Sequence, residues 1–216
     1  MKRATVALAA LVAAGAWGVN GASAETYTFC GITNNNSEST AAGEAQLRVD
    51  VTDAGAGQVL FTFYHVGDVQ MSITDIYFDD GTLLGIASID DSDPGVEFSL
   101  GADPGNLPGG NSVGFEATAG MTADSDPPAQ PNGVNPGETV GILFNLQAGK
   151  TFADVLAALE IGFGEGGLVI GIHVQGFDGG WSEAFITCEP PRTVPAPAGV
   201  ALGLAGLAPV VTRRRR

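Results

Sequence analysis

The chain has 216 residues, with 24 acidic and nine basic side chains and a formal net charge of −15. This acidity argues against nucleic acid and anionic membrane surfaces as partners, because both would repel a negatively charged protein. The length suits one domain with a sizeable core rather than several domains.

The N-terminus has the layout of a secretory signal peptide over residues 1–24. A positively charged start and the apolar stretch Ala4–Val19 precede small residues at Ala22 and Ala24, and cleavage there would leave Glu25 as the first residue. The alternative is an N-terminal helix of the core, which fits less well because the stretch is apolar around its whole circumference. We therefore expect a mature domain over residues 25–192.

All 24 acidic residues lie in this mature domain, whereas most of the basic residues lie outside it. Solubility outside the cell would explain such a composition, and cation binding is the alternative explanation.

The only two cysteines, Cys30 and Cys188, lie near the two ends of the mature domain. An exported chain reaches an oxidising compartment, so we expect one disulfide that joins the first and last strands. Two buried free thiols are the alternative. A structural zinc site is excluded for this pair alone, because tetrahedral coordination needs four ligands.

The middle of the chain consists of short segments of alternating polarity between Gly, Pro, Asn and Asp turns. This pattern predicts an all-β fold, an antiparallel β-sandwich of about ten strands that is jelly-roll-like. The pattern continues along the whole mature region, so it forms one domain. The predicted strands are Thr26–Ile32, Ala45–Thr52, Val59–Val66, Ile73–Phe78, Thr82–Ser88, Val96–Leu100, Val113–Thr118, Thr139–Leu146, Leu168–Gln175 and Ser182–Cys188.

One segment has helical spacing instead. Thr151 and Asp154 form an approximate capping box before apolar residues at helical intervals, so we expect one short helix at Phe152–Glu160, with a turn and a further strand as the alternative. Gly120–Gly137 contains four prolines and no periodicity, which predicts a long surface loop.

No catalytic signature is visible. The two histidines, His65 and His173, each fall in a predicted strand, and neither a Gly-x-Ser-x-Gly turn nor a His-Glu-x-x-His helix is present. Paired carboxylates can hydrolyse glycosides, but acidic residues are too abundant here for the sequence to single out a pair.

Two acidic turns make calcium the candidate cofactor. Asp79 and Asp80 form one turn, and Asp90, Asp91 and Asp93 crowd the other. Carboxylate oxygens are the ligands that calcium prefers, although the spacing differs from an EF-hand loop. Asp-Pro-Gly and Asp-Asp-Gly are also common turn formers, and an ordinary pair of turns is the alternative.

The C-terminal residues 193–216 combine three features in order. Pro195-Ala196-Pro197 opens the segment, a span of Ala, Gly, Leu and Val follows, and Arg213, Arg214, Arg215 and Arg216 end it. As a helix, residues 194–212 would extend about 28 Å, close to the thickness of a bilayer core. The arginines would stop translocation and leave the rest of the chain outside the cytoplasm.

This order of features resembles the PEP-CTERM sorting signal of exported bacterial proteins, with Pro195-Ala196-Pro197 where that family has Pro-Glu-Pro. The segments Tyr77–Gly81 and Gly171–Ile186 are also similar to stretches of secreted PEP-CTERM domains. The resemblance implies an exosortase-type membrane protease and the secretion machinery as partners, and at least transient membrane anchoring. It further implies extracellular polysaccharide as a destination. An ordinary C-terminal tail anchor is the alternative.

Together these features predict an exported, non-catalytic protein of the cell surface or matrix. The first alternative is a calcium-assisted carbohydrate-binding module that uses Trp181 as a stacking platform, although a lone aromatic near a strand is more often part of the core. A glycoside-active enzyme is the second alternative.

Overall fold

The structure, a computed structural model, describes residues 24–80 and 84–188. Ten antiparallel strands form one sheet in the order β5-β8-β3-β2-β1-β10-β9-β4-β7-β6. The all-β class and the number of strands are therefore confirmed. The signal peptide before Ala24 and the C-terminal sorting segment lie outside the described residues.

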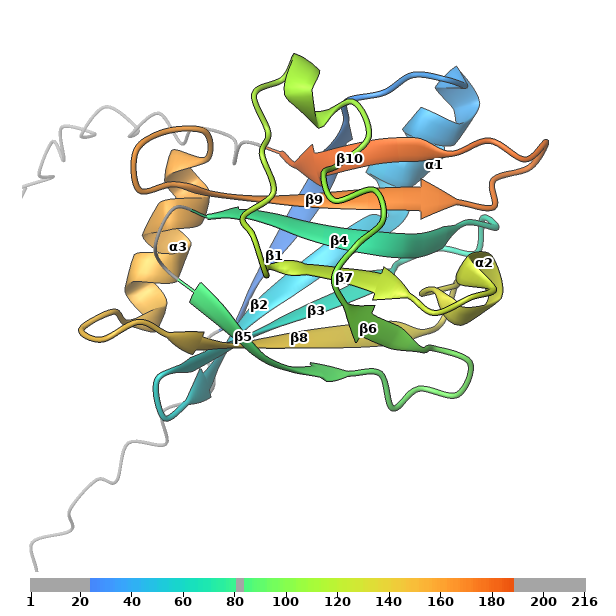
Figure 1. The fold of residues 1–216 in the computed structure, drawn as a ribbon. Helices are drawn as coiled ribbons and strands as arrows, with labels where there is room; N and C mark the ends of the chain where they lie inside the picture. Colours follow the sequence, from blue (N-terminus) through green and yellow to red (C-terminus); the bar gives the residue numbers. More distant parts are fainter. Residues whose placement is uncertain (1–23, 81–83, 189–216) are drawn as a thin grey trace, which may run out of the picture.

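The sheet is almost a barrel, flattened like a sandwich, and β1 (Ala24–Gly31) belongs to both halves. Residues at the start of β1 pair with β2, and Phe29 to Gly31 pair with β10. The two strands at the opposite ends of this order, β5 and β6, approach one another (Figure 1). The predicted sandwich is thus one sheet curled onto itself.

Two groups of strands continue from β1 in opposite directions. The first comprises β2 (Leu47–Gly55), β3 (Gln58–His65), β8 (Thr139–Leu146) and β5 (Leu84–Asp90). The second comprises β10 (Glu183–Thr187), β9 (Leu168–Gln175), β4 (Ser72–Asp80), β7 (Thr122–Ser125) and β6 (Phe98–Leu100).

The main core lies inside this curled sheet, where alternate strand residues meet. Phe61 packs edge-on against Phe78 and Phe144, with ring centroids 5.2 and 5.4 Å apart. Such edge-to-face pairs add to the stability that burial alone provides. A smaller cluster on the outer face of β4 and β9 packs Tyr77 against Phe115, beneath the segment that connects β6 to β7.

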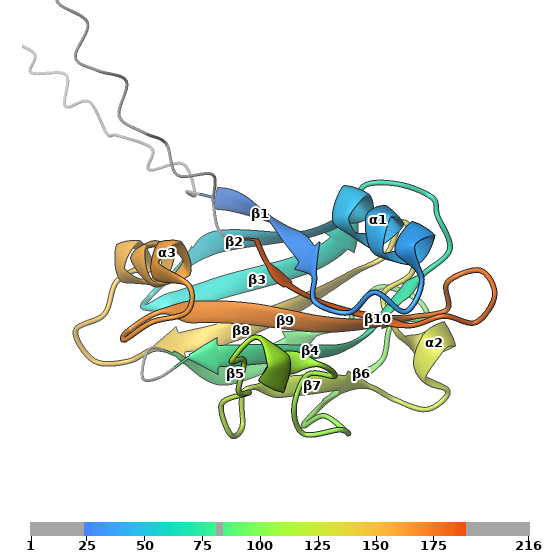
Figure 2. The same cartoon turned by 90° about the horizontal axis from the view of Figure 1, so that it is seen from above.

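The described residues form three α-helices and one 3-10 helix, so the prediction of a single short helix is wrong in number. They are α1 (Ser37–Gln46), the 3-10 helix η1 (Gly110–Ser112), α2 (Ala129–Asn132) and α3 (Phe152–Ile161). The predicted helix is confirmed as α3, and Thr151 and Asp154 form its capping box. Figure 1 places α3 at one end of the strands and α2 at the other, and Figure 2 shows α1 and α3 on the same face. None of the helices in the described ranges is long and apolar enough to cross a bilayer.

Two predictions for the middle of the chain are wrong. Residues 113–118 are not a strand but an irregular segment whose Phe115 is buried as an anchor. The predicted surface loop 120–137 contains β7 and α2. Strand β7 pairs with β4 and β6, and its Thr122 and Ser125 are buried despite their polarity.

The disulfide between Cys30 and Cys188 is confirmed. It joins β1 to the residue after β10, and it closes a loop with a sequence separation of 158. Cys30 is exposed, so the alternative of two buried free thiols is wrong.

Candidate functional site

A hollow of about 360 Å³ opens where three segments meet: the start of α1, the β3–β4 connection and the β9–β10 connection. Trp181 and Val69 stand exposed at this hollow, with 43% and 40% of their surfaces accessible, whereas Phe177 is buried. Its volume lies within the range of about 300–1,000 Å³ that is typical of small-molecule sites. We call it the Trp181 hollow.

The β9–β10 connection holds the indole of Trp181 against its own backbone. Gly179 has a positive φ of 80°, and a Cβ at this position would lie 3.2 Å from Trp181 Nε1. The Gly180 amide donates to the Phe177 carbonyl over 2.9 Å and closes the turn. Because Phe177 is part of the main core, the turn is anchored and the exposed indole is held in place.

A buried carboxylate fixes the opposite wall. Glu183 is only 1% exposed, and it accepts hydrogen bonds from Thr33 Oγ1 (2.6 Å) and from the backbone amides of Asn35 (3.1 Å) and Asn36 (2.6 Å). Hydrogen bonds to an ionised acceptor are stronger than those between neutral groups. Glu183 therefore ties the residues before α1 to β10, which brings the first turn of α1 next to Trp181.

Three polar side chains around the hollow keep hydrogen-bonding capacity, two at the start of α1 and one on the β9–β10 connection. Asn36 caps α1 through its carbonyl oxygen, which accepts from the Ser39 amide over 2.9 Å, and its amide nitrogen donates to no acceptor within the described ranges. Glu38 and Asp178 are exposed, and their carboxylates make no hydrogen bond or ion pair with any described residue. An exposed aromatic face with a donor and two anionic acceptors is a binding arrangement for a polar, partly apolar molecule.

The two predicted calcium turns lie far apart. Asp80 pairs with Leu168 at the end of the strands near α3, whereas Asp90 pairs with Gly141 at the other end. The five aspartates therefore do not converge on one point. Across residues 24–80 and 84–188, no three His, Cys, Asp or Glu side chains gather in a way that could hold a metal ion.

Four of these aspartates accept hydrogen bonds from nearby or distant parts of the same chain. Asp79 Oδ2 accepts from the Glu116 amide over 3.1 Å, and burial raises the pKa of Asp79. Asp90 accepts from the Ser92 amide over 3.3 Å. Asp91 accepts from the Phe98 amide over 3.1 Å, a bond within the β5–β6 connection and the start of β6. Asp93 accepts from the amide and the hydroxyl of Thr139 over 2.8 and 2.9 Å, which ties this connection to the start of β8.

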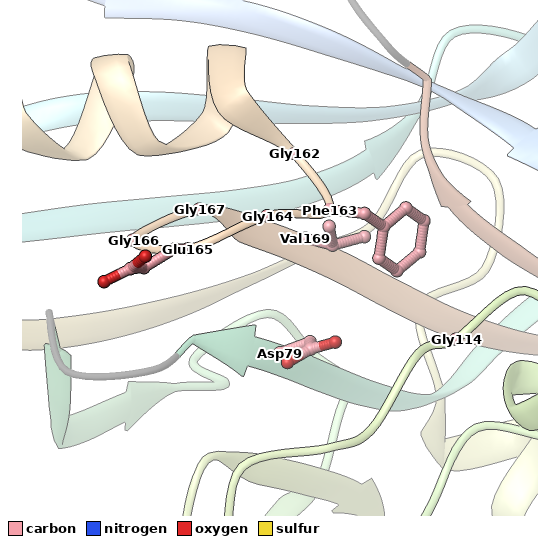
Figure 3. Close-up of a pocket in the computed structure, with 9 residues that line it drawn as sticks. All are labelled: Asp79, Gly114, Gly162, Phe163, Gly164, Glu165, Gly166, Gly167 and Val169. Atoms are coloured by element: carbon pink, nitrogen blue, oxygen red, sulfur yellow. The ribbon is translucent and has the colours of Figure 1, made fainter.

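A second hollow, of about 610 Å³, lies beside β9 at the end near α3 (Figure 3). Glycines make up most of its wall, and among the described residues that line it only Asp79 and Glu165 are charged. The Phe163 ring lies beside Val169, with Asp79 across from them on β4 (Figure 3). Glycine backbone offers few groups that select a ligand, so this hollow is the weaker candidate.

Three titratable side chains form a row across neighbouring strands. Asp75 on β4 pairs in register with Asp124 on β7 and with His173 on β9. His173 Nδ1 lies 3.0 Å from Asp75 Oδ2, which also accepts from the Thr74 hydroxyl over 2.8 Å. Asp75 is 3% exposed, so this carboxylate is closed to a substrate.

Asp124 is half-buried beside the Asp75 carboxylate. Burial, the charge of Asp75 and a hydrogen bond with Asp75 raise the pKa of Asp124 to about 6. Near neutral pH, Asp124 therefore changes its protonation more readily than an ordinary aspartate.

The remaining sequence-predicted residues occupy different places. Ala24 and Glu25 form the exposed start of β1, while Ala22, Pro195, Ala196, Pro197 and Arg213–Arg216 lie outside the described residues. Trp181 was identified from the sequence, but Asn36 and Glu38 were not. The sequence does hold a pattern typical of a helix start, namely a capping residue at Asn36 followed by Glu38 and several alanines. A search for apolar periodicity does not detect this pattern, because the helix has no apolar stripe.

No family model, curated protein or solved structure matches the chain.

Proposed function

We propose that the chain is an exported, non-catalytic protein of the cell surface or extracellular matrix, delivered by a signal peptide and by a PEP-CTERM-like sorting segment. The observation that supports this proposal most directly is the Cys30–Cys188 disulfide. Disulfides of this kind persist outside the cytoplasm, where thiols are not kept reduced.

The proposed processing sites flank this disulfide-closed domain. Cleavage after Ala24 would leave Glu25, at the exposed start of β1, as the new N-terminus. The sorting segment, with Pro195-Ala196-Pro197 and the terminal arginines, follows Cys188 and the end of β10. An exosortase-type protease would cut near the proline motif after the apolar span has anchored the chain in the membrane.

Fractionation of producing cells tests this proposal. The wild-type protein should be recovered from the envelope or the medium without the four arginines. A variant with Arg213–Arg216 changed to alanine should lose its stop-transfer block and reach the medium with its C-terminus uncut. Recovery of wild type with Arg216 still present in the membrane would favour the tail-anchor alternative, and recovery from the cytosol would contradict both.

The second candidate function is saccharide binding, which the Trp181 hollow favours. An aromatic ring that is 43% exposed and backed by hydrogen-bonding side chains offers a stacking face together with polar contacts. Because the aspartates of the predicted calcium turns lie elsewhere, this candidate does not depend on them. A glycan array with added calcium and with chelator tests it: binding that persists with chelator supports the hollow alone, and binding that chelator abolishes supports calcium assistance.

A further inference from the structure

We propose that the Trp181 hollow binds a saccharide that carries a free amino group, such as a hexosamine unit of an extracellular polysaccharide. This inference rests on the second candidate function and names its ligand class. It concerns the first turn of α1 and the β9–β10 connection, and it does not depend on how the chain is exported.

The indole of Trp181 supplies most of the apolar surface that a sugar ring could contact. One face of a pyranose ring presents mainly C–H groups, which pack well on a flat aromatic surface. Gly179 lets the Trp181 ring lie against the loop backbone, and Val69 adds a second exposed apolar surface. The hollow therefore presents a stacking face that is already formed without a ligand, which limits the ordering entropy lost on binding.

The polar side chains of the hollow can bind the hydroxyl groups of the sugar. The Asn36 amide nitrogen can donate to a hydroxyl oxygen, and the carboxylates of Glu38 and Asp178 can accept from hydroxyl hydrogens. All three groups lack protein partners among the described residues, so a ligand would satisfy them without breaking internal hydrogen bonds.

Charge then selects among saccharides. Glu38 and Asp178 place two negative charges at the hollow, and no basic side chain of the described residues lines it. Arg48 and Lys150 are the only basic residues within the described ranges. An ammonium group on the sugar would compensate these carboxylates, whereas the carboxylate of a uronic acid would be repelled.

The test measures binding by isothermal titration calorimetry, with the oxidised full chain in a detergent that has no sugar headgroup. Five probes are compared: glucosamine oligomers, N-acetylglucosamine oligomers, glucose oligomers, galacturonic acid oligomers and the simple cation tetramethylammonium. Glucosamine oligomers should bind most tightly and galacturonic acid oligomers should not bind. Raising the salt from 0.05 to 0.5 M should weaken glucosamine binding, because it screens the exposed carboxylates.

Variants connect the binding to the hollow. Trp181→Ala should weaken glucosamine binding at least about tenfold, and Glu38→Gln or Asp178→Asn about fivefold each. Phe163→Ala is the matched control, because Phe163 is 42% exposed in the hollow near α3 and should leave binding unchanged. Glu165→Gln is the corresponding control for loss of an exposed carboxylate.

The outcomes separate the two proposals. Equal binding of glucosamine and glucose oligomers, lost in Trp181→Ala, would overturn the amino-group selectivity and leave saccharide binding standing. Failure of every oligomer to bind would overturn both. Tetramethylammonium that binds as tightly as glucosamine oligomers would show that the hollow recognises a simple cation through the indole, and would also overturn the inference.

Discussion

Replacing Glu183 by glutamine tests how the Trp181 hollow is built. The carboxylate accepts three hydrogen bonds while only 1% exposed, and two of them come from the backbone amides of Asn35 and Asn36. A glutamine oxygen can keep the two bonds made by Oε2, from Thr33 and Asn35, but its NH₂ group would then face the Asn36 amide. One charge-assisted bond is lost, and a buried donor is left without an acceptor.

The expected loss in the free energy of unfolding is about 3 kcal/mol, from a lost bond to a charged group and an unsatisfied buried amide. For a domain of this size, that corresponds to a fall in Tm of about 6–12 °C. Urea unfolding of Glu183→Gln and of the matched surface variant Glu165→Gln, whose carboxylate is exposed, measures the difference. A change below about 0.5 kcal/mol in Glu183→Gln would refute the claim that this carboxylate fixes the start of α1.

Three further predictions concern other parts of the fold. Cys30→Ser with Cys188→Ser should lower the free energy of unfolding by about 2–5 kcal/mol, because the disulfide closes a loop with a separation of 158 residues; loss below about 1 kcal/mol in urea unfolding would contradict this. Asp124 keeps its proton up to a pKa of about 6 in the folded state but loses it near 4 when unfolded, so its contribution to stability falls as pH rises between those values. Asp124→Asn should therefore match the stability of wild type near pH 4 and exceed it by about 1 kcal/mol at pH 7, after allowance for partial exposure. Thermal melts across this pH range measure the difference, with Asp68→Asn as a control at an exposed aspartate. A variant less stable than wild type at pH 7 would contradict the raised pKa of Asp124. Gly171→Val should destabilise by about 1–3 kcal/mol, because a Cβ there would meet Leu107 at 2.8 Å, and unchanged thermal stability would show that the outer cluster yields freely.

The sequence predicted the strands that are short, largely apolar runs between turns. Thr139–Leu146 and Leu168–Gln175 have the predicted bounds as β8 and β9, because each run ends at glycine-containing turns. The capping box at Thr151 likewise predicted the start of α3. Local rules suffice where the local pattern and the tertiary environment agree.

The missed elements lack such a pattern. Helix α1 is rich in Ser, Ala and Glu and has no apolar stripe, and its position is set by contacts with residues almost 150 positions away, such as Glu183. Strand β7 has the polar sequence Thr-Ala-Asp-Ser and is buried because it pairs with β4 and β6. Since sequence periodicity carries no information on these distant pairings, Trp181 could be proposed from the sequence but its polar neighbours could not.

Intact mass spectrometry of the protein isolated from its producing cells tests the central claim most directly. The account predicts a chain that begins at Glu25, ends before Arg213 and carries Cys30 and Cys188 as a disulfide. A full-length chain with an uncut leader and two free thiols would contradict it.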